Sequence, residues 1–410
     1  MDYGLSGESI ICFGGEDWWY HHPHSKNHIL KRLAGRNRVL FVNSLSMGLP
    51  SLLSPDFFLK IRRKLKSYRR WLKRAPEGLW VMTPIAVPFF GSAWARRLNR
   101  RLLNWQLRAA MWHCGMSRPI VWVAIPSAAD AAESLDAKLI VYQVSDKYDA
   151  NQDSPISKSV ISELHQRLLK LARVVFYSGR RLFDEALEVP HRAYLEQAVD
   201  YDHFANPAPD TAAEIAQIPH PVLGYFGAMD FVMDTALIRE VARRRPAWNW
   251  VLIGLKSKLM QAAEGPNLHF LGSKPYAELP RYLRHFDVCV LPWDLGSAFT
   301  AYGSAIKVRE YLASGKPIVM APLFEYLQTP GIRFYSDADD FIVQVEDALA
   351  NDSAADRELR QSSVRGCTWD ARAREVGTLM QKLLASEVLP NRPVTAPSAS
   401  ISRQAVPQIH

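Results

Sequence analysis

The sequence predicts an α/β protein made of two doubly wound domains that face a cleft. The chain has 410 residues, which is about twice the usual size of one domain. Short apolar runs alternate with helical patterns in both halves, as parallel sheets covered by helices require. A proline-rich stretch at 204–221 separates the two series and is typical of a linker.

In the first half, five short apolar runs are expected to form buried parallel strands. They are SIICF (9–13), RVLFV (38–42), PIVWVAI (119–125), KLIVYQV (138–144) and RVVFYS (173–178). Helical patterns fall between them, notably at 92–113 and 157–172.

The same alternation restarts after the linker, with a helix near 234–244 behind the first run. The expected strands are VLGYFG (222–227), NWVLIG (249–254), LHFLG (268–272), DVCVLPW (287–293), PIVMA (317–321) and IRFYS (332–336). Ligands of such sheets lie beyond the carboxyl ends of the strands. The loops that follow residues 13, 144, 227, 254 and 293 are therefore expected near the site.

The cysteines and the N-terminus indicate a reduced, cytoplasmic setting. Cys12, Cys114, Cys289 and Cys367 lie far apart and form no CxxC pair, so neither a zinc knuckle nor a disulfide framework is indicated. The first residues have no basic region and too short an apolar run for a signal peptide. No apolar stretch is long enough to predict a transmembrane helix.

The net charge of +9 is concentrated near the N-terminus. Residues 1–110 hold 19 Lys and Arg against 6 Asp and Glu, a balance of +13, whereas the remainder has a balance of −4. Such asymmetry indicates an anionic partner, such as a membrane surface, a nucleic acid or an acidic polymer.

Two motifs of the second half suit a diphosphate and a ribose. GYFGAMD ends a strand with Gly227 before a helix, where a missing side chain lets a diphosphate approach, although a plain tight turn explains it equally well. In SAIKVREYLASGKPIVM (304–320), Lys307 and Glu310 share one helix face. The lysine could neutralise a diphosphate and the carboxylate could accept ribose hydroxyls; an exposed ion pair is the alternative.

KVREYLASGKPIV resembles the K-x-x-E-Y-L-A-x-G-K-P-V-V segment of bacterial group 1, family 4-like glycosyltransferases with the GT-B fold. Successive blocks, VLGYFGAMD, PNLHFLGSKPYAELPRYLRHFDVCVLPW and CTWDARAREV, are similar to the same family in the same order. The resemblance is closest to enzymes of capsule, exopolysaccharide and teichuronic acid assembly. It implies two Rossmann-like domains and a C-terminal helix that crosses back to the first domain.

The resemblance also implies a division of the chain and a set of donor contacts. The expected division is an acceptor domain at 1–205, a nucleotide-sugar domain at 206–368, a crossover helix at 369–386 and a disordered tail at 387–410. Lys307 resembles the phosphate lysine, Glu310 the ribose glutamate and Gly227 the diphosphate glycine. The full donor-binding set is Gly227, Lys256, Tyr276, Tyr302, Ser304, Lys307 and Glu310. The family needs no bound metal or cofactor, and its substrate here would be a UDP- or GDP-linked sugar.

Tyr302 is a departure from the family. It stands where the first glutamate of the E-x7-E motif would contact the donor sugar. The identity of the sugar and a retaining mechanism are therefore both in question.

If the enzyme inverts, a base must take the acceptor proton. Asp146 follows a strand at the cleft edge, and it resembles, more remotely, the proposed base of the xanthan glucuronosyltransferase. Asp17 is a second candidate; helix capping or substrate orientation is the alternative role for Asp146.

Two basic segments of the first half are expected at a membrane. FFLKIRRKLKSYRRWLKRA (57–75) has nine basic residues, no acid and a helical apolar stripe. Its expected membrane residues are Arg62, Arg63, Lys64, Arg69, Arg70 and Trp71. A second segment, 94–113, adds five arginines and a stripe of Trp94, Leu98, Leu102, Trp105 and Leu107. The alternative is that such a stripe packs on the core. No nucleic-acid recognition motif is present.

The loop GGEDWWYHHPHSKNHIL (14–30) follows the first strand and is expected beside the acceptor. Gly15 allows a turn, Trp18 can stack on a sugar, and His22 can hydrogen-bond to it. The histidines match no zinc pattern, so no metal is expected.

These observations predict a cytoplasmic glycosyltransferase, peripheral on the inner membrane. It would extend a polyprenyl-diphosphate-linked saccharide in cell-surface polysaccharide synthesis. A nucleotide-sugar 2-epimerase and a non-catalytic GT-B scaffold subunit are the alternatives.

Overall fold

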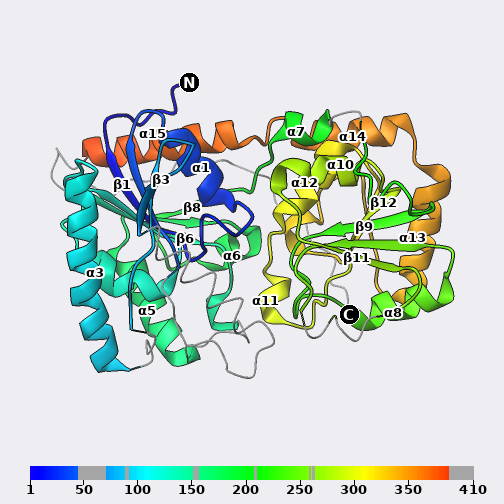
Figure 1. Ribbon diagram of the computed structural model, residues 1–410, viewed down its shortest axis with the longest axis horizontal. Helices are drawn as coiled ribbons and strands as arrows, with labels where there is room; N and C mark the ends of the chain where they lie inside the picture. The colour runs from blue at the N-terminus through cyan, green and yellow to red at the C-terminus, as the bar shows by residue number, and fades with distance from the viewer. Residues whose placement is uncertain are drawn as a thin grey trace.

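The computed structural model describes residues 1–44, 71–87, 92–150, 157–206, 210–257, 260 and 264–386. They form two α/β domains, each built on one sheet, which lie side by side (Figure 1). The expectation of two doubly wound domains is confirmed. Among the described residues, no helix has the length and apolar character that crossing a bilayer requires. The tail at 387–410 lies outside the described residues.

The first domain holds an eight-stranded sheet in the order β3-β4-β2-β1-β5-β6-β7-β8. Its strands are β1 (Ser9–Phe13), β2 (Arg38–Val42), β3 (Leu72–Arg74), β4 (Trp80–Met82), β5 (Ile120–Val123), β6 (Leu139–Val144), β7 (Val174–Tyr177) and β8 (Arg192–Tyr194). All neighbours are parallel except β3 and β4. The strand order reverses between β1 and β5, so this is where a ligand crevice is expected.

The second domain holds a six-stranded parallel sheet in the order β11-β10-β9-β12-β13-β14. Its strands are β9 (Val222–Phe226), β10 (Asn249–Ile253), β11 (Leu268–Gly272), β12 (Val288–Leu291), β13 (Ile318–Met320) and β14 (Ile332–Phe334). The order reverses between β9 and β12, which places the loop that contains Gly227 at the switch point.

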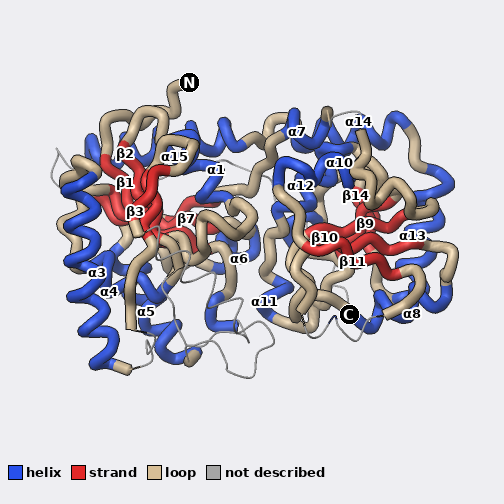
Figure 2. Tube along the Cα trace, viewed as in Figure 1, coloured by secondary structure: helices blue, strands red, loops and turns tan. Residues whose placement is uncertain are grey.

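Helices cover both faces of each sheet (Figure 2). In the first domain they are α1 (Ser25–Leu33), α3 (Ala93–His113), α4 (Ala129–Glu133), α5 (Lys158–Leu171) and α6 (Arg180–Glu185), with the short η1 (Pro126–Ala128) and η2 (Tyr148–Ala150). The helices that follow β8 in the chain are α7 (Tyr201–Ala205), α8 (Thr235–Arg244), α10 (Leu279–Leu283), α11 (Ala298–Ala301), α12 (Ile306–Ser314), α13 (Ala338–Asn351), α14 (Ala354–Val364) and α15 (Trp369–Ser386), with the short η3 (Tyr276–Glu278) and η4 (Phe324–Tyr326). All of them except α15 belong to the second domain or to the connection into it.

The chain crosses between the domains twice. Ala198 belongs to the core of the first domain, whereas Val199 belongs to the core of the second, so the first crossing precedes the boundary predicted at 205/206. The second crossing lies between Val364 and Trp369, because Trp369 already packs in the first core. Helix α15 then lies over the first domain beside α1, in orange-red in Figure 1. The predicted crossover helix is confirmed.

Three short strands were not predicted, namely β3, β4 and β8. Each has three residues, too few to form a recognisable apolar run. Strand β3 also corrects the helix expected over 57–75, because Leu72–Arg74 is extended and pairs with β4. The rest of that segment, with Arg62, Arg63, Lys64, Arg69 and Arg70, lies outside the described residues. Trp71 is described and packs, partly buried, against the core of the first domain.

Candidate active site

Gly227 and Lys307 meet at the switch point of the second sheet. Gly227 follows β9 with φ +142°, and a Cβ atom there would lie 2.2 Å from the Lys307 Nζ. Lys307 comes from the first turn of α12, and its Nζ donates to the Tyr225 Oη at 2.9 Å. The ammonium group therefore lies directly over a stretch of backbone without a side chain, which is a suitable place for a diphosphate.

Gly254 keeps the neighbouring loop equally close. It follows β10 with φ +148°, and a Cβ atom there would lie 1.8 Å from the Gly227 carbonyl oxygen. The Gly227 N–H donates to the Ile253 carbonyl at 2.8 Å, which ties the two loops together. Only glycine fits both positions, because a side chain at either one would fill the space or strain the backbone.

Glu310 lies one helical turn beyond Lys307 and is buried. Burial raises the pKa of its carboxyl group to about 8, although the charge of Lys307 and a hydrogen bond from Tyr276 act in the opposite direction. A buried carboxyl group in this position can exchange hydrogen bonds with the hydroxyls of a ribose. The alternative of an exposed ion pair is wrong for Glu310, since the group is not exposed.

Tyr276 covers Glu310 and links it to the first domain. Its ring lies 5.5 Å from that of His28 in α1 and 5.4 Å from that of His203 in α7. Its Oη donates to the Asp200 carboxylate at 3.3 Å, and Asp200 also contacts His28 Nδ1 at 3.3 Å. Tyr276, a member of the predicted donor-binding set, thus stands where α1, α7 and α12 come together.

Tyr302 extends across to the first domain. Its Oη donates to the Glu185 Oε2 at 2.5 Å, and its ring lies 4.2 Å from both the Lys147 Nζ and the Arg181 Cζ. The hydrogen bond from Tyr302 is the main cause that lowers the pKa of Glu185. At the position where the family resembled by the sequence is expected to have a glutamate, this chain has an aromatic ring held between two cations of the opposite domain.

The other two predicted donor residues lie at the same edge of the second sheet. Ser304 stands just before α12, two residues after Tyr302. Lys256 follows β10, and its Nζ lies 3.7 Å from the ring centroid of Phe270 in β11. Lys256 thus engages an aromatic face of its own sheet, and its donor contact stays a prediction.

On the first domain, Asp146 belongs to a charged cluster at the carboxyl ends of β1 and β6. Lys26 and Glu16 are both buried, with Nζ and Oε2 2.8 Å apart. Burial raises the pKa of Asp146, and the nearby charge of Lys26 opposes that effect. A carboxylate with a raised pKa is a better proton acceptor, which suits the base predicted at this position. Sequence reasoning missed Glu16, whose only signal was its place right after β1.

Asp17 serves its own turn. Its carboxylate accepts from the Trp19 N–H at 2.9 Å, and its carbonyl oxygen accepts from the N–H groups of Tyr20 and His21. These contacts shape the loop after β1, and contact with an acceptor hydroxyl stays a prediction for Asp17.

The predicted acceptor residues divide between packing and the cleft. Gly15 has φ +88°, and a Cβ atom there would lie 2.3 Å from Ile125. Trp18 packs inward, with its ring centroid 4.9 Å from that of Phe41. His22 is exposed; partial desolvation lowers its pKa, and the charge of Lys307 in the opposite domain acts in the same direction. The charge of Lys307 thus reaches His22 from the second domain.

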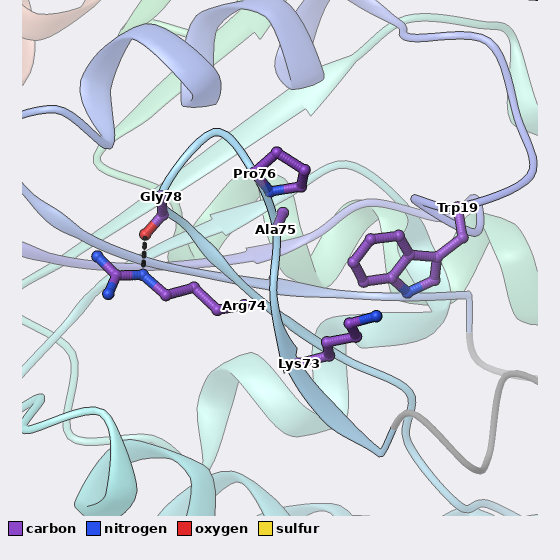
Figure 3. Close-up of a pocket in the computed structure, with 6 residues that line it drawn as sticks. All are labelled: Trp19, Lys73, Arg74, Ala75, Pro76 and Gly78. Carbon is purple, nitrogen blue, oxygen red and sulfur yellow. Dashed lines mark hydrogen bonds between the residues drawn. The ribbon is translucent and has the colours of Figure 1, made fainter.

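A pocket of about 500 Å³ lies beside this loop on the first domain (Figure 3). Its lining residues are Trp19, Lys73, Arg74, Ala75, Pro76 and Gly78. The Lys73 Nζ lies 5.6 Å from the ring centroid of Trp19, whereas Arg74 turns to the other side and donates to the Gly78 carbonyl. An indole and an ammonium group on one wall suit a sugar that carries an anionic group.

No group of three His, Cys, Asp or Glu side chains that could hold a metal ion exists within the described ranges. The histidines of the 14–30 stretch have other contacts. His28 stacks on Trp369 at 4.6 Å between ring centroids, and His21 contacts the backbone of Asp17.

The chain is similar to known glycosyltransferases. Residues 220–351 match the family model described as Glycosyl transferases group 1. The chain is 24% identical over 285 residues to a putative teichuronic acid biosynthesis glycosyltransferase, TuaH, of Bacillus subtilis, a match that covers 63% of this chain and 71% of TuaH. The matched family segment contains Gly227, Lys307 and Glu310. The chain is a glycosyltransferase, and its residues 220–351 are similar to group 1.

Solved structures show the same fold over both domains. Sucrose-phosphate synthase of Thermosynechococcus elongatus superposes with a TM-score of 0.69 at 13% identity, over 92% of this chain and all (100%) of that one. Trehalose 6-phosphate synthase of Burkholderia multivorans gives 0.60 at 13% identity, over 94% and 100%. Anabaena HepE, in complex with UDP and glucose, gives 0.55 at 11% identity, over 93% and 99%. The predicted GT-B fold of this glycosyltransferase is confirmed.

Proposed function

We propose that this glycosyltransferase moves a sugar from a UDP- or GDP-linked donor to a polyprenyl-diphosphate-linked saccharide at the cytoplasmic face of the inner membrane. The observation that carries the proposal is the Lys307 ammonium over Gly227, with the buried Glu310 one turn further along α12. These groups match the two parts that all such donors share, a diphosphate and a ribose.

The donor would lie at the switch point of the second sheet. Lys307 neutralises the diphosphate, and the absence of a side chain at Gly227 lets the phosphates come close to the backbone. Glu310 binds the ribose hydroxyls once Tyr276 moves from it. We propose that Lys307 supplies the positive charge that the diphosphate needs and that transfer requires no bound metal or cofactor.

Asp146 is the candidate base for the acceptor. In an inverting transfer, the acceptor oxygen bonds to the anomeric carbon as the bond to the diphosphate breaks. The nucleoside diphosphate leaves with the electron pair, and the acceptor proton moves to the Asp146 carboxylate. The raised pKa of Asp146 supports this role. In a retaining transfer, Asp146 would instead orient the acceptor.

The acceptor assignment is supported by the first domain and by the relative. TuaH is described as a teichuronic acid biosynthesis glycosyltransferase, which is a role in cell-surface polysaccharide assembly. Trp19 and Lys73 offer an aromatic face and a cation in one pocket. Exopolysaccharide or capsule assembly would present an anionic lipid-linked saccharide of this kind at a membrane, and the basic first quarter of the chain suits that surface. No nucleic-acid partner is proposed.

The decisive experiment incubates the full chain with a panel of UDP- and GDP-sugars and a polyprenyl-diphosphate-linked saccharide. We expect one donor to yield an extended lipid whose mass and anomeric configuration identify the sugar and the stereochemistry. Glu310→Ala should abolish transfer, whereas Glu346→Gln, an exposed change on α13, should not. Release of an epimerised nucleotide sugar without acceptor, or nucleotide binding without any transfer, would contradict the proposal.

Membrane attachment is tested separately. Charge reversal at Arg62, Arg63 and Lys64 should release the chain from anionic vesicles if the predicted basic segment holds it there. Unchanged co-sedimentation would remove that part of the proposal.

A further inference from the structure

Helix α3 carries an aromatic stripe on the face that points away from the protein. Trp94, Leu98, Trp105 and Trp112 are 59%, 46%, 70% and 85% exposed. Together with Arg101 and Arg108 they follow steps of four, three, four, three and four residues, so they form one line along the helix. Isolated exposed apolar side chains are common, but a continuous line that includes three tryptophans marks an interaction surface.

The opposite face of α3 is locked onto the first domain. Leu103, Leu107 and Ala110 belong to its core. Two amide side chains also fix the rotation of α3 about its own axis. Asn99 exchanges two hydrogen bonds with the backbone of Val87, at 2.7 and 2.8 Å, and Gln106 does the same with Ile85, at 2.9 and 2.8 Å. Because the hydrogen bonds of Asn99 and Gln106 hold the buried face of α3 against the domain, the tryptophan stripe stays on the outer face.

This geometry corrects the stripe expected from the sequence. Leu107 was expected in line with Trp94 and Trp105, but it is fully buried on the other face. Trp112 takes its place at the end of the stripe. The alternative, that the stripe packs on the core, is wrong for Trp94, Leu98 and Trp105.

The charges around the stripe have one sign. The helix has five arginines and no acid, and Arg97, Arg100, Arg101 and Arg108 are all exposed. In the part of the chain that the structure describes, no carboxylate pairs with any of these four; only Arg96, on the inner side, contacts Glu163. Figure 1 places α3, in cyan, along the outer flank of the first domain, at the end opposite the second domain. The exposed side chains of the stripe therefore belong to a helix at the end of the first domain that is farthest from the second domain.

We infer that the outer face of α3 is a docking surface for an anionic lipid bilayer. Tryptophan prefers the membrane interface because its ring is apolar and its N–H can stay hydrated. Arginines beside the stripe meet the anionic headgroups, and each basic residue strengthens the attraction. This inference deepens the proposed membrane attachment, but it rests on α3 alone and does not depend on the sugar that is transferred.

The test is co-sedimentation of the full chain with vesicles of phosphatidylglycerol and phosphatidylcholine, without donor or acceptor. Wild type should bind the mixed vesicles and leave pure phosphatidylcholine vesicles unbound. Arg97→Glu/Arg101→Glu/Arg108→Glu should weaken binding at least tenfold. The matched control, Arg239→Glu/Arg243→Glu, reverses two exposed charges on α8 in the second domain and should bind as wild type.

A second variant tests the aromatic stripe. Trp94→Ser/Trp105→Ser/Trp112→Ser should weaken vesicle binding severalfold and abolish the blue shift of tryptophan emission that vesicles induce. The control Val343→Ser/Leu359→Ser, at exposed positions of α13 and α14, should change neither. Circular dichroism and nucleotide binding should match wild type in all variants, since none of the changed side chains supports the core.

Three results would overturn the inference. The first is that both α3 variants bind the vesicles as tightly as the wild type does. The second is a concentration-dependent dimer that the tryptophan variant dissociates, since the stripe would then join two copies. The third is binding of RNA or DNA in place of vesicles, lost in the arginine variant. Vesicle binding with no glycosyl transfer would instead remove the proposed reaction and leave the α3 surface standing.

Discussion

The two domains present different kinds of chemistry to the cleft between them. The second domain offers Lys307 and Glu310 from one helix, set over two glycine turns at the switch point of a parallel sheet. The first domain offers Asp146, Lys26 and His22 from separate loops and helix starts. The second domain, which we propose as the donor half, gathers its groups on one helix and two neighbouring glycine turns. The first domain, which we propose as the acceptor half, is assembled from segments far apart in the chain.

The largest expected effect breaks the acceptor half only. Asp146→Asn should lower kcat by about 10²–10⁴-fold, because the acceptor proton loses its base. Nucleotide affinity, measured by calorimetry, should stay unchanged. Asp136→Asn, at an exposed carboxylate of the same domain, is the control and should retain full activity. Near-normal transfer by Asp146→Asn would eliminate the base and leave an orienting role.

Glu310 gives the donor half a pH-dependent stability. Its pKa is raised to about 8 in the folded chain from an ordinary 4.5, so between these values the folded chain holds a proton that the unfolded chain has lost. The free energy of unfolding therefore falls as pH rises through this window, by up to about 1.4 kcal/mol per unit.

Replacing this carboxyl group removes that loss. Relative to wild type, Glu310→Gln should gain stability from about pH 5 to about pH 8, in thermal unfolding of the full chain. Glu346→Gln should show no such gain. Identical pH profiles for wild type and Glu310→Gln would contradict a buried, protonated Glu310.

Lys307 tests whether the proposed donor half binds the phosphates of the nucleotide. Lys307→Ala should weaken binding of a nucleoside diphosphate by about tenfold to a hundredfold, because a charge-assisted contact contributes about 1.5–3 kcal/mol. Binding of the nucleoside without phosphates should change little. Lys382→Ala, an exposed lysine on α15, is the control. Equal losses for nucleoside and diphosphate would place Lys307 away from the phosphates.

His22 tests the acceptor side of the same cleft. His22→Ala should raise the acceptor KM severalfold and leave donor KM nearly unchanged, since we propose that this first-domain loop holds the acceptor and the charge of Lys307 reaches His22 from the opposite domain. A rise in donor KM alone would assign His22 to the donor half. His113→Ala, at the far end of α3, should alter neither constant.

The smallest expected effect concerns the contact that joins the halves. Tyr302→Phe keeps the ring between Lys147 and Arg181 but removes the hydrogen bond to Glu185. A double-mutant cycle with Glu185→Gln should give a coupling energy of about 0.5 kcal/mol in unfolding, small because both groups are partly exposed. If Tyr302→Phe changes the preference for the donor sugar and shows no coupling to Glu185, Tyr302 contacts the donor sugar, as its position in the motif implies.

Local sequence predicted much of the frame. Strands β1, β2 and β11 match their expected bounds, because a buried parallel strand needs a short, continuous apolar run and little else. Lys307 and Glu310 could be paired because two residues three positions apart in a helix lie on the same face. Gly227 could be placed because a strand that ends in glycine before a helix is a local signal.

Other features depend on contacts between segments far apart in the chain. Glu16 gained a role only when β1 and α1 placed Lys26 beside it, and Tyr302 gained Glu185 as a partner only when the domains docked. Asp200 links α1 to Tyr276 through contacts that no spacing encodes.

Helix α3 shows the division most clearly. Helical periodicity alone determined that Trp94, Leu98 and Trp105 share one face. It could not determine which way that face turns, because both faces of α3 hold apolar side chains. The tertiary structure decided it through the hydrogen bonds of Asn99 and Gln106, which fix one face inward and leave the tryptophans outside.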